Sequence, residues 1–313
     1  MNVILFGNMQ GIEKIEDTQE PRMTLIASFA NESYWGSMAN GFTKAGEDLG
    51  ISTKCIGFTE LNIEKQIEAI RSAIYAEVDG IVTAGNEESE EFRQVLKEAQ
   101  QSGIPVVLVD SDVENIEKLC YVGTDNYKAG KLAGEEIIEA TGGSGKVAVV
   151  VSNLKVTNQR ERLRGFEDMV KEYPEIEIVK VLEGNSDSRI LNEQISGMLE
   201  EQEDLAAVFC AEGYSTTTIC QLIKDAQEEY KDLKVVGFGV GTKQKKNIEE
   251  DILYSTIYQN SYEMGYQSLK LLQKSMEHKS IPPVTYTKLK SIKKENIEDM
   301  VLDEGKGAQW YIY

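Results

Sequence analysis

Short apolar runs recur along most of the chain, and each is followed by a longer stretch in which apolar and polar positions alternate with helical spacing. The runs are rich in Val and Ile and are apolar at both odd and even positions, as is typical of strands buried on both faces of a parallel sheet. They lie at Thr24–Ala30, Gly80–Ala84, Ile104–Asp110, Lys146–Ser152, Ile176–Leu182, Ala206–Cys210 and Lys234–Phe238.

The stretches between these runs predict helices that cover the sheet. They are amphipathic and lie at Glu64–Ala76, Glu87–Gln101, Lys128–Ala140, Glu161–Glu172, Ser188–Glu201 and Ser215–Glu229. Strands that alternate with helices indicate an α/β, doubly wound fold. The pattern runs twice, over Thr24–Asp110 and over Lys146–Phe238. We therefore expect two Rossmann-like lobes, with a ligand cleft at the carboxyl ends of their strands.

Composition and charge exclude several classes of function. The 313 residues include 33 basic and 53 acidic side chains, so the formal net charge is −20. Such a charge repels phosphate backbones and anionic lipid, which argues against nucleic-acid binding. His278 is the only histidine, and the four cysteines are far apart in the sequence, so neither a histidine metal cluster nor a zinc ribbon is expected. We predict no metal site and no cofactor.

The N-terminus is expected to be a leader or tether over residues 1–21. The apolar start Met1–Gly7 is too short for a signal sequence, and residues 8–22 are polar. The start is consistent with a truncated membrane anchor, a truncated signal or an unstructured end, and the sequence leaves these open. No segment has the apolar length of a spanning helix.

Glycine-rich segments do not indicate a nucleotide site or an enzyme. Gly142–Lys146 lacks the Ser or Thr that follows Lys in a phosphate loop, and it precedes a predicted strand instead of following one. Gly237–Gly241 follows a predicted strand but lacks the third glycine at the spacing that a dinucleotide fingerprint requires. Tight turns explain both segments. No nucleophile and base are paired in the sequence, so we do not expect an enzyme.

Polar and aromatic side chains gather where predicted strands end or helices begin, and together they suggest a binding site for a polyol. Aromatic rings can stack on a sugar face, while carboxylates and Arg hydrogen-bond its hydroxyl groups. The candidate ligand-binding residues are Glu32, Tyr34, Trp35, Asp110, Arg162, Glu212, Phe238 and Gln259.

Three segments resemble the ribose/galactose-type family of type-I periplasmic binding proteins: Ile104–Asp110, Val122–Gly134 and Arg160–Phe166. With Val235–Phe238 and Thr256–Gln259, the resemblance extends from about Thr24 to Lys290. It implies two lobes joined by a hinge of three crossings. The implied N-terminal lobe comprises residues 22–124 plus 260–288, and the C-terminal lobe comprises residues 125–259 plus 289–313.

The resemblance also assigns roles to the candidate residues. Asp110 and Arg162 match positions that hold sugar hydroxyls, Gln259 matches a polar hinge position, and Tyr34, Trp35 and Phe238 match the aromatics that enclose the ring. The chain departs from the family pattern at five positions. Glu32 and Glu212 stand near positions where the family has Asn, Ser111 stands near an expected Arg, and Gly239 stands near an expected Asp. Ala84 stands where the family usually has a polar residue. These departures imply a ligand other than ribose: another sugar, or an amine-bearing compound whose charge the carboxylates offset.

The family resemblance leaves several functions open. The leading one is an extracellular solute-binding protein that closes on a monosaccharide or related polar ligand and delivers it to an ABC permease. The second is an extracellular ligand-sensing domain that signals to a membrane histidine kinase. The third, an effector domain of a LacI-type repressor, requires a helix-turn-helix of about 50–60 residues before the first lobe, and only 22 residues precede it. Either of the first two implies attachment to the outer face of the cytoplasmic membrane.

Overall fold

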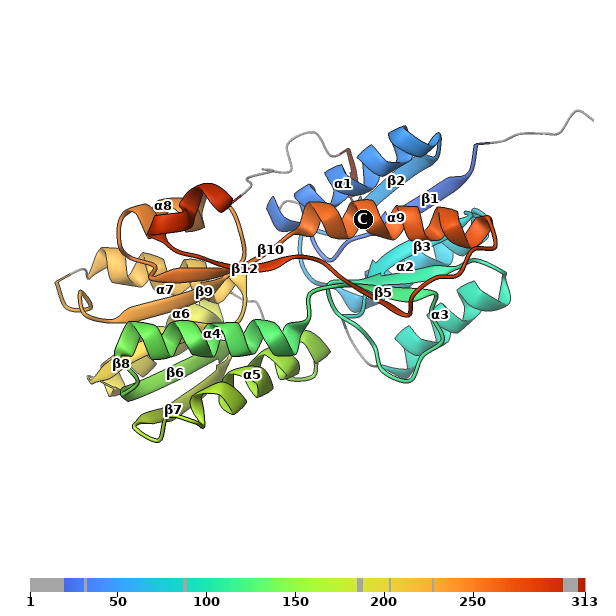
Figure 1. Ribbon diagram of the computed structural model, residues 1–313. Coiled ribbons are helices and arrows are strands. Elements are labelled where there is room, and N and C mark those ends of the chain that lie inside the picture. The colour runs from blue at the N-terminus through green and yellow to red at the C-terminus, as the bar shows by residue number, and fades with distance from the viewer. Residues whose placement is uncertain are drawn as a thin grey trace, which may run out of the picture.

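The structure is a computed structural model, and it describes residues 20–30, 33–86, 89–184, 188–202, 204–226, 228–300 and 309–312. It contains two sheets, each covered by helices on both faces (Figure 1). All strand pairs are parallel except β10 with β12. The predicted doubly wound α/β fold with two lobes is therefore confirmed.

The N-lobe is built on a seven-stranded sheet of order β11-β5-β4-β3-β1-β2-β13. Helices α1 and α9 pack on one face of this sheet, and α2 and α3 pack on the other. The strands are β1 (Arg22–Ile26), β2 (Ser52–Gly57), β3 (Gly80–Ala84), β4 (Val106–Val109), β5 (Cys120–Gly123), β11 (Val284–Tyr286) and β13 (Trp310–Ile312), and the helices are α1 (Ser33–Leu49), α2 (Ile63–Tyr75), α3 (Glu90–Gln101) and α9 (Ser261–Met276).

The C-lobe is built on a six-stranded sheet of order β12-β10-β9-β8-β6-β7. Helices α4 and α5 cover one face, and α6, α7 and α8 cover the other. The strands are β6 (Gly145–Val151), β7 (Ile176–Glu183), β8 (Leu205–Cys210), β9 (Lys234–Phe238), β10 (Ser255–Gln259) and β12 (Leu289–Ile292), the helices are α4 (Asn126–Thr141), α5 (Thr157–Val170), α6 (Ser188–Glu201), α7 (Gly213–Asp225) and α8 (Thr242–Glu249), and a 3-10 helix spans Lys294–Asp299.

Six of the seven predicted apolar runs match strands to within two residues at each end, whereas the first, Thr24–Ala30, extends four residues beyond β1; the runs did not include β2, β10, β11, β12 or β13. Strands β3 and β9 and helix α6 have the predicted bounds. Strand β2 begins Ser52-Thr53-Lys54, and only its second half is buried, so its apolar run is too short to be recognised. Strand burial on both faces is what makes the other runs visible in the sequence.

The C-terminal strand departs from the expected division of the chain. Residues 289–313 were assigned to the C-lobe, but β13 pairs in parallel with β2 of the N-lobe, with Trp310 opposite Cys55. Trp310 packs against the N-lobe core, and its ring lies so close to Gly57 that a Cβ there would be 3.0 Å away. Partial burial of this large ring at an otherwise open sheet edge favours the position of β13. The chain therefore passes between the lobes once more after β12.

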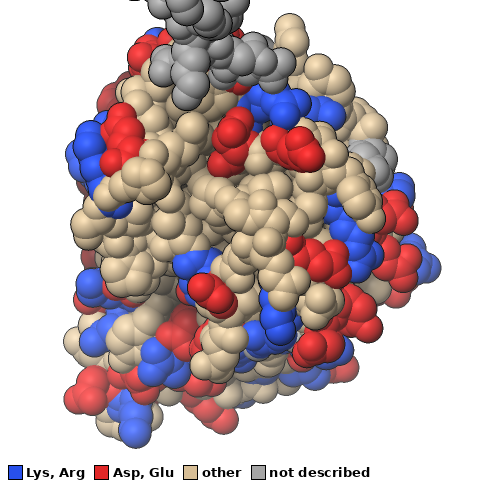
Figure 2. All heavy atoms as spheres, turned by 90° about the vertical axis from the view of Figure 1, so that its right-hand side faces the viewer, with Lys and Arg blue, Asp and Glu red and all other residues tan. Residues whose placement is uncertain are grey.

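Both acidic and basic side chains lie on the face of the molecule at the N-lobe end (Figure 2). Figure 2 views the N-lobe end, where acidic and basic side chains are interspersed over the visible face. In the described part of the chain, no helix combines the length and the apolar character required to cross a bilayer. Residues 1–19 of the expected leader lie outside the described residues.

Candidate functional site

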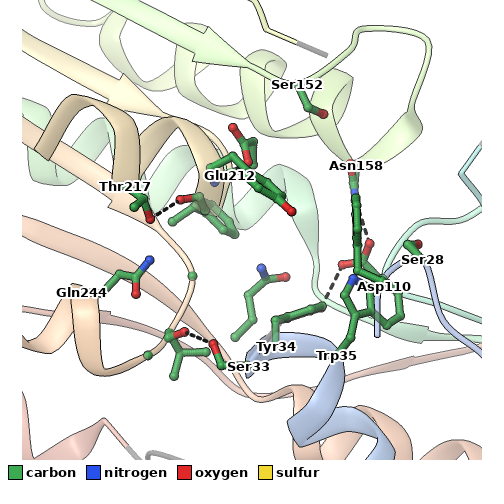
Figure 3. A pocket seen from close by; sticks show the side chains of 18 of the residues that line it. Ser28, Ser33, Tyr34, Trp35, Asp110, Ser152, Asn158, Glu212, Thr217 and Gln244 are labelled. Carbon is green, nitrogen blue, oxygen red and sulfur yellow. Dashed lines mark hydrogen bonds between the residues drawn. The ribbon is translucent and has the colours of Figure 1, made fainter. Parts of the chain in front are cut away.

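A cavity of about 470 Å³ lies between the two lobes, at the carboxyl ends of their strands (Figure 3). Its volume is within the range of small-molecule binding sites. Seven of the eight predicted residues line it: Tyr34, Trp35, Asp110, Arg162, Glu212, Phe238 and Gln259. The eighth, Glu32, lies outside the described residues.

Asp110 directly follows β4 and brings a carboxylate into this cavity. Its φ of +63° places it in the left-handed region, where Asp is tolerated better than most residues. One carboxylate oxygen accepts a hydrogen bond from the hydroxyl of Tyr34 at 2.8 Å, and the other accepts one from the amide of Asn158 at 3.3 Å. Asn158 belongs to the C-lobe, so Asp110 connects the two lobes across the cavity.

Burial dominates the electrostatics of this carboxylate. Desolvation raises the pKa of Asp110, and the nearby charge of Arg162 and the Tyr34 hydrogen bond only partly oppose it. Burial and the adjacent carboxylate also raise the pKa of Tyr34 well above its ordinary value. Tyr34 therefore remains a neutral donor, and the two side chains form one polar unit.

Arg162 on α5 is the buried cation of the cavity, with 3% of its surface exposed. Its guanidinium donates to Asn126 Oδ1 at 2.9 Å, to the carbonyl oxygen of Ala211 at 2.8 Å and to Gln259 Oε1 at 3.2 Å. It also lies 3.9 Å above the ring centre of Phe238. Burial lowers its pKa, but arginine is so basic that it stays charged. These partners fix the guanidinium in one orientation.

Gln259 lies where the chain leaves β10 for the N-lobe. Its Oε1 accepts hydrogen bonds from Arg162 and, at 2.8 Å, from the hydroxyl of Thr124. Thr124 lies on another crossing between the lobes. The two crossings are therefore hydrogen-bonded to each other and to the cation of the cavity.

Glu212 lines the cavity as predicted and also caps a helix. It is the N-cap of α7, where one oxygen accepts from the backbone N–H of Tyr214 at 2.6 Å and the other from that of Ser215 at 2.7 Å. Burial raises its pKa, and these hydrogen bonds counteract the rise. Glu212 lines the cavity, but both of its oxygens are already used to cap the helix.

Aromatic rings form part of the cavity wall. Tyr34 and Trp35 meet edge to face, with ring centres 5.5 Å apart. Phe29 of the N-lobe and Tyr214 of the C-lobe approach to 5.9 Å across the cavity mouth. The lobes are thus in contact around the cavity as well as at the hinge.

Several polar residues of the cavity were not predicted from the sequence. They follow strands or begin helices, and the cavity lining includes Ser28, Asn86, Ser152, Asn158, Gln159 and Gln244. Asn86 lies two residues beyond Ala84, where the family has a polar residue, and it donates to the Ser28 hydroxyl at 2.7 Å. In the sequence, these residues could be recognised only as polar residues that come just after an apolar run. Such residues are common in loops, which makes the signal weak.

Comparisons with known proteins show what this chain is similar to. Residues 23–280 match the family described as "Periplasmic binding protein domain". The galactofuranose-binding protein YtfQ of Escherichia coli is 31% identical over 165 residues, which cover 51% of each chain. The glucose-galactose binding protein GanP of Geobacillus stearothermophilus is 29% identical, with a TM-score of 0.85 over 89% of this chain and 99% of GanP. The XylFII–LytSN complex contains a chain that is 29% identical, with a TM-score of 0.81 over 89% of this chain and 99% of that one. YtfQ and GanP are named as binding proteins, and the chain belongs to the periplasmic binding protein domain family.

Proposed function

We propose that this protein binds a monosaccharide-sized sugar in the interlobe cavity and does not transform it. The carrying observation is that a half-buried carboxylate from the N-lobe, Asp110, and a buried guanidinium from the C-lobe, Arg162, line one cavity together with aromatic rings. A carboxylate accepts from sugar hydroxyls, a guanidinium donates to them, and the rings cover the apolar faces of the sugar.

The relatives support a sugar as the ligand, because YtfQ and GanP are named for galactofuranose and for glucose and galactose. The absence of turnover is supported by the side chains themselves. Asp110, Glu212 and Arg162 are each engaged by hydrogen bonds. The Tyr34 hydroxyl is bonded to the Asp110 carboxylate, but the pKa of Tyr34 is raised, so it stays protonated and is not an activated nucleophile.

Delivery of the sugar to an ABC permease outside the cytoplasmic membrane is the function we favour. Sensing is the second candidate, in which the occupied protein signals to a membrane histidine kinase. It is favoured by one observation: XylFII, to which this chain is similar along most of its length, has been solved in a complex with LytSN. Attachment to the membrane through the N-terminal leader fits both functions.

A thermal-shift screen of pentoses, hexoses, polyols and amino sugars tests the binding function. A ligand present at about 100 times its Kd stabilises the protein by about 2.7 kcal/mol, which a shift in Tm reveals. NMR of the bound sugar after prolonged incubation should show it unchanged. A new product would contradict the non-catalytic function.

The Arg162→Ala variant then tests the site by calorimetry. Because loss of a charged hydrogen-bond partner costs about 1.5–3 kcal/mol, affinity should fall by roughly tenfold or more. Arg164→Ala is the matched control, since Arg164 lies on the same helix but is exposed and paired with Glu161. Equal affinity of both variants and the wild type would remove Arg162 from the site.

A further inference from the structure

The first turn of α8 forms one wall of the cavity and has no side-chain cap. Residues 239–244 all line the cavity. Gly241, the N-cap residue, provides no side-chain oxygen for the N–H groups of Thr242, Lys243 and Gln244. These groups have no partner within a helix, and they give its N-terminus a partial positive charge.

Glycine is required for this arrangement. Gly241 has a φ of +155°, and a Cβ there would lie 3.1 Å from Gln244 Oε1 and 3.2 Å from the hydroxyl oxygen of Ser33. Gly239 also has a positive φ, of +99°. The loop thus brings main chain, with no intervening side chain, up to the ligand space.

Gln244 provides an independent observation that this wall is a binding surface. Only 8% of it is exposed, and Figure 3 shows its amide directed into the cavity. None of the hydrogen bonds found between described residues involves this amide, which faces the cavity and is left to bond to water or to a ligand. A ligand group in the cavity would satisfy it.

Lys243 adds a positive charge to this turn, in a chain whose net charge is −20. Lys243 lines the cavity and takes part in none of the ion pairs found in the described ranges, whereas Lys245 and Lys246 pair with Glu298 and Glu250. A lysine in the first turn is unfavourable for the helix itself, because it adds positive charge to the positive end of the dipole.

The negative groups of the cavity are engaged elsewhere. Glu212 is held by the first N–H groups of α7, and Asp110 by Tyr34 and Asn158. Within the same cavity, therefore, the start of α7 already holds a carboxylate from the protein, whereas the start of α8 presents free donors.

We propose that the ligand is a sugar with an anionic substituent, a carboxylate or a phosphate, which binds to the first turn of α8 and to the amide of Gln244. The inference rests on the proposed sugar-binding function and names the ligand class. Asp110 and Arg162 then hold the hydroxyls of the sugar, while α8 holds its acidic end. Helix N-termini are common binding sites for such groups.

Calorimetry with matched sugars tests this proposal. The neutral parent sugars are glucose, galactose, xylose and ribose. The affinity for each parent is compared with the affinity for its uronate, its aldonate and its terminal phosphate. We expect one anionic form to bind about tenfold more tightly than its parent, a difference within the range of buried helix-dipole contacts. Whether a uronate, an aldonate or a phosphate gains most identifies the substituent.

Two variants assign the preference to α8. Gln244→Glu keeps the shape of the side chain but adds a negative charge, and Lys243→Gln removes a positive one; both should remove most of the preference for the anionic sugar. The matched controls are Gln101→Glu, on the exposed end of α3, and Lys246→Gln, on the same helix but outside the cavity. Both controls should retain the preference, and denaturant unfolding establishes that all four variants are folded.

The outcomes separate this proposal from the sugar-binding function. Neutral parents that bind as tightly as their anionic forms overturn the anionic ligand but leave sugar binding intact. A preference that survives both Gln244→Glu and Lys243→Gln overturns the role of α8. Binding of no sugar in the panel overturns both the ligand class and the proposed function.

Discussion

Asp110 combines two features that are individually unfavourable, a left-handed backbone and a half-buried, desolvated carboxylate. Its raised pKa means that the folded protein holds a proton on this group more readily than the unfolded chain does. Between the ordinary pKa and the raised one the folded state binds more protons, so this group's contribution to stability falls as the pH rises through that interval. At neutral pH the ionised group costs stability.

The Asp110→Asn variant should therefore be more stable than the wild type at neutral pH, and the difference should decrease as the pH is lowered towards about 4. Asn tolerates the positive φ and can still accept from Tyr34. Sugar affinity should fall by about tenfold, because an amide replaces a charged acceptor. Denaturant unfolding at several pH values and calorimetry check the two effects. A variant less stable than the wild type at neutral pH would contradict this account of the carboxylate.

Tyr121 is a positioning residue for Asp110. Its hydroxyl donates to the main-chain oxygen of Asp110 at 2.8 Å and lies 3.3 Å from that of Thr124 at the hinge. A Cβ at Gly123 would lie 2.1 Å from this hydroxyl, so only glycine leaves room for it. Tyr121 thus ties the left-handed turn of the binding residue to a crossing between the lobes.

Tyr121→Phe should lower sugar affinity by about threefold to tenfold, the effect of one buried hydrogen bond, because Asp110 is less firmly oriented. Tyr127→Phe is the control, since it also loses one hydroxyl, which bonds to Asp168 at an exposed position. Calorimetry measures affinity, and small-angle scattering with saturating sugar reports closure. Wild-type affinity in Tyr121→Phe would contradict a positioning role.

At the scale of elements, two pairs of crossing helices hold the binding side chains. In the N-lobe α1, which carries Tyr34, crosses α9 at Gly265, where a Cβ would lie 1.9 Å from the carbonyl oxygen of Met38. In the C-lobe α5, which carries Arg162, crosses α4 at Gly165, where a Cβ would lie 2.0 Å from that of Tyr127. Because glycine has no side chain, the two backbones of each pair can come into contact. This contact fixes the position of α1 and of α5, and therefore of the side chains that they place in the cavity.

Gly165→Ala should lower the free energy of unfolding by at least about 1–3 kcal/mol, the cost of overpacking, because the backbones must separate. Gly197→Ala, on α6, provides the opposite control: no atom lies within 4 Å of its Cβ, so the variant should be more stable by about 0.5–1 kcal/mol. Denaturant unfolding measures both variants. Equal effects of the two substitutions would contradict the close helix crossing.

At the scale of the molecule, the lobes meet along the cavity as well as at the hinge. The Ser33 hydroxyl donates to the carbonyl oxygen of Val240 at 3.4 Å, and the amide of Asn158 donates to the carboxylate of Asp110. These two contacts are polar, and the rings of Phe29 and Tyr214 add an aromatic one. A ligand that bridges the lobes adds further contacts to them. The hinge needs only a few torsions to open.

Saturating sugar should therefore reduce the radius of gyration measured by small-angle scattering. Tyr214→Ala removes the ring that meets Phe29 across the cavity mouth, and this variant should have a larger radius of gyration than the wild type without sugar. With saturating sugar the difference between them should diminish. Identical profiles with and without sugar would contradict ligand-driven closure.

The sequence by itself determined the doubly wound class and most strand positions, because burial on both faces of a sheet requires continuous apolar runs. It also located Asp110 and Arg162, because polar groups at strand ends and family motifs coincide there. It could not assign Glu212, since a carboxylate at a strand end looks the same whether it meets a ligand or caps a helix. Only the tertiary structure decided that, together with the burial of Gln244 and the pairing of β13 with β2, because each depends on contacts between segments far apart in the chain.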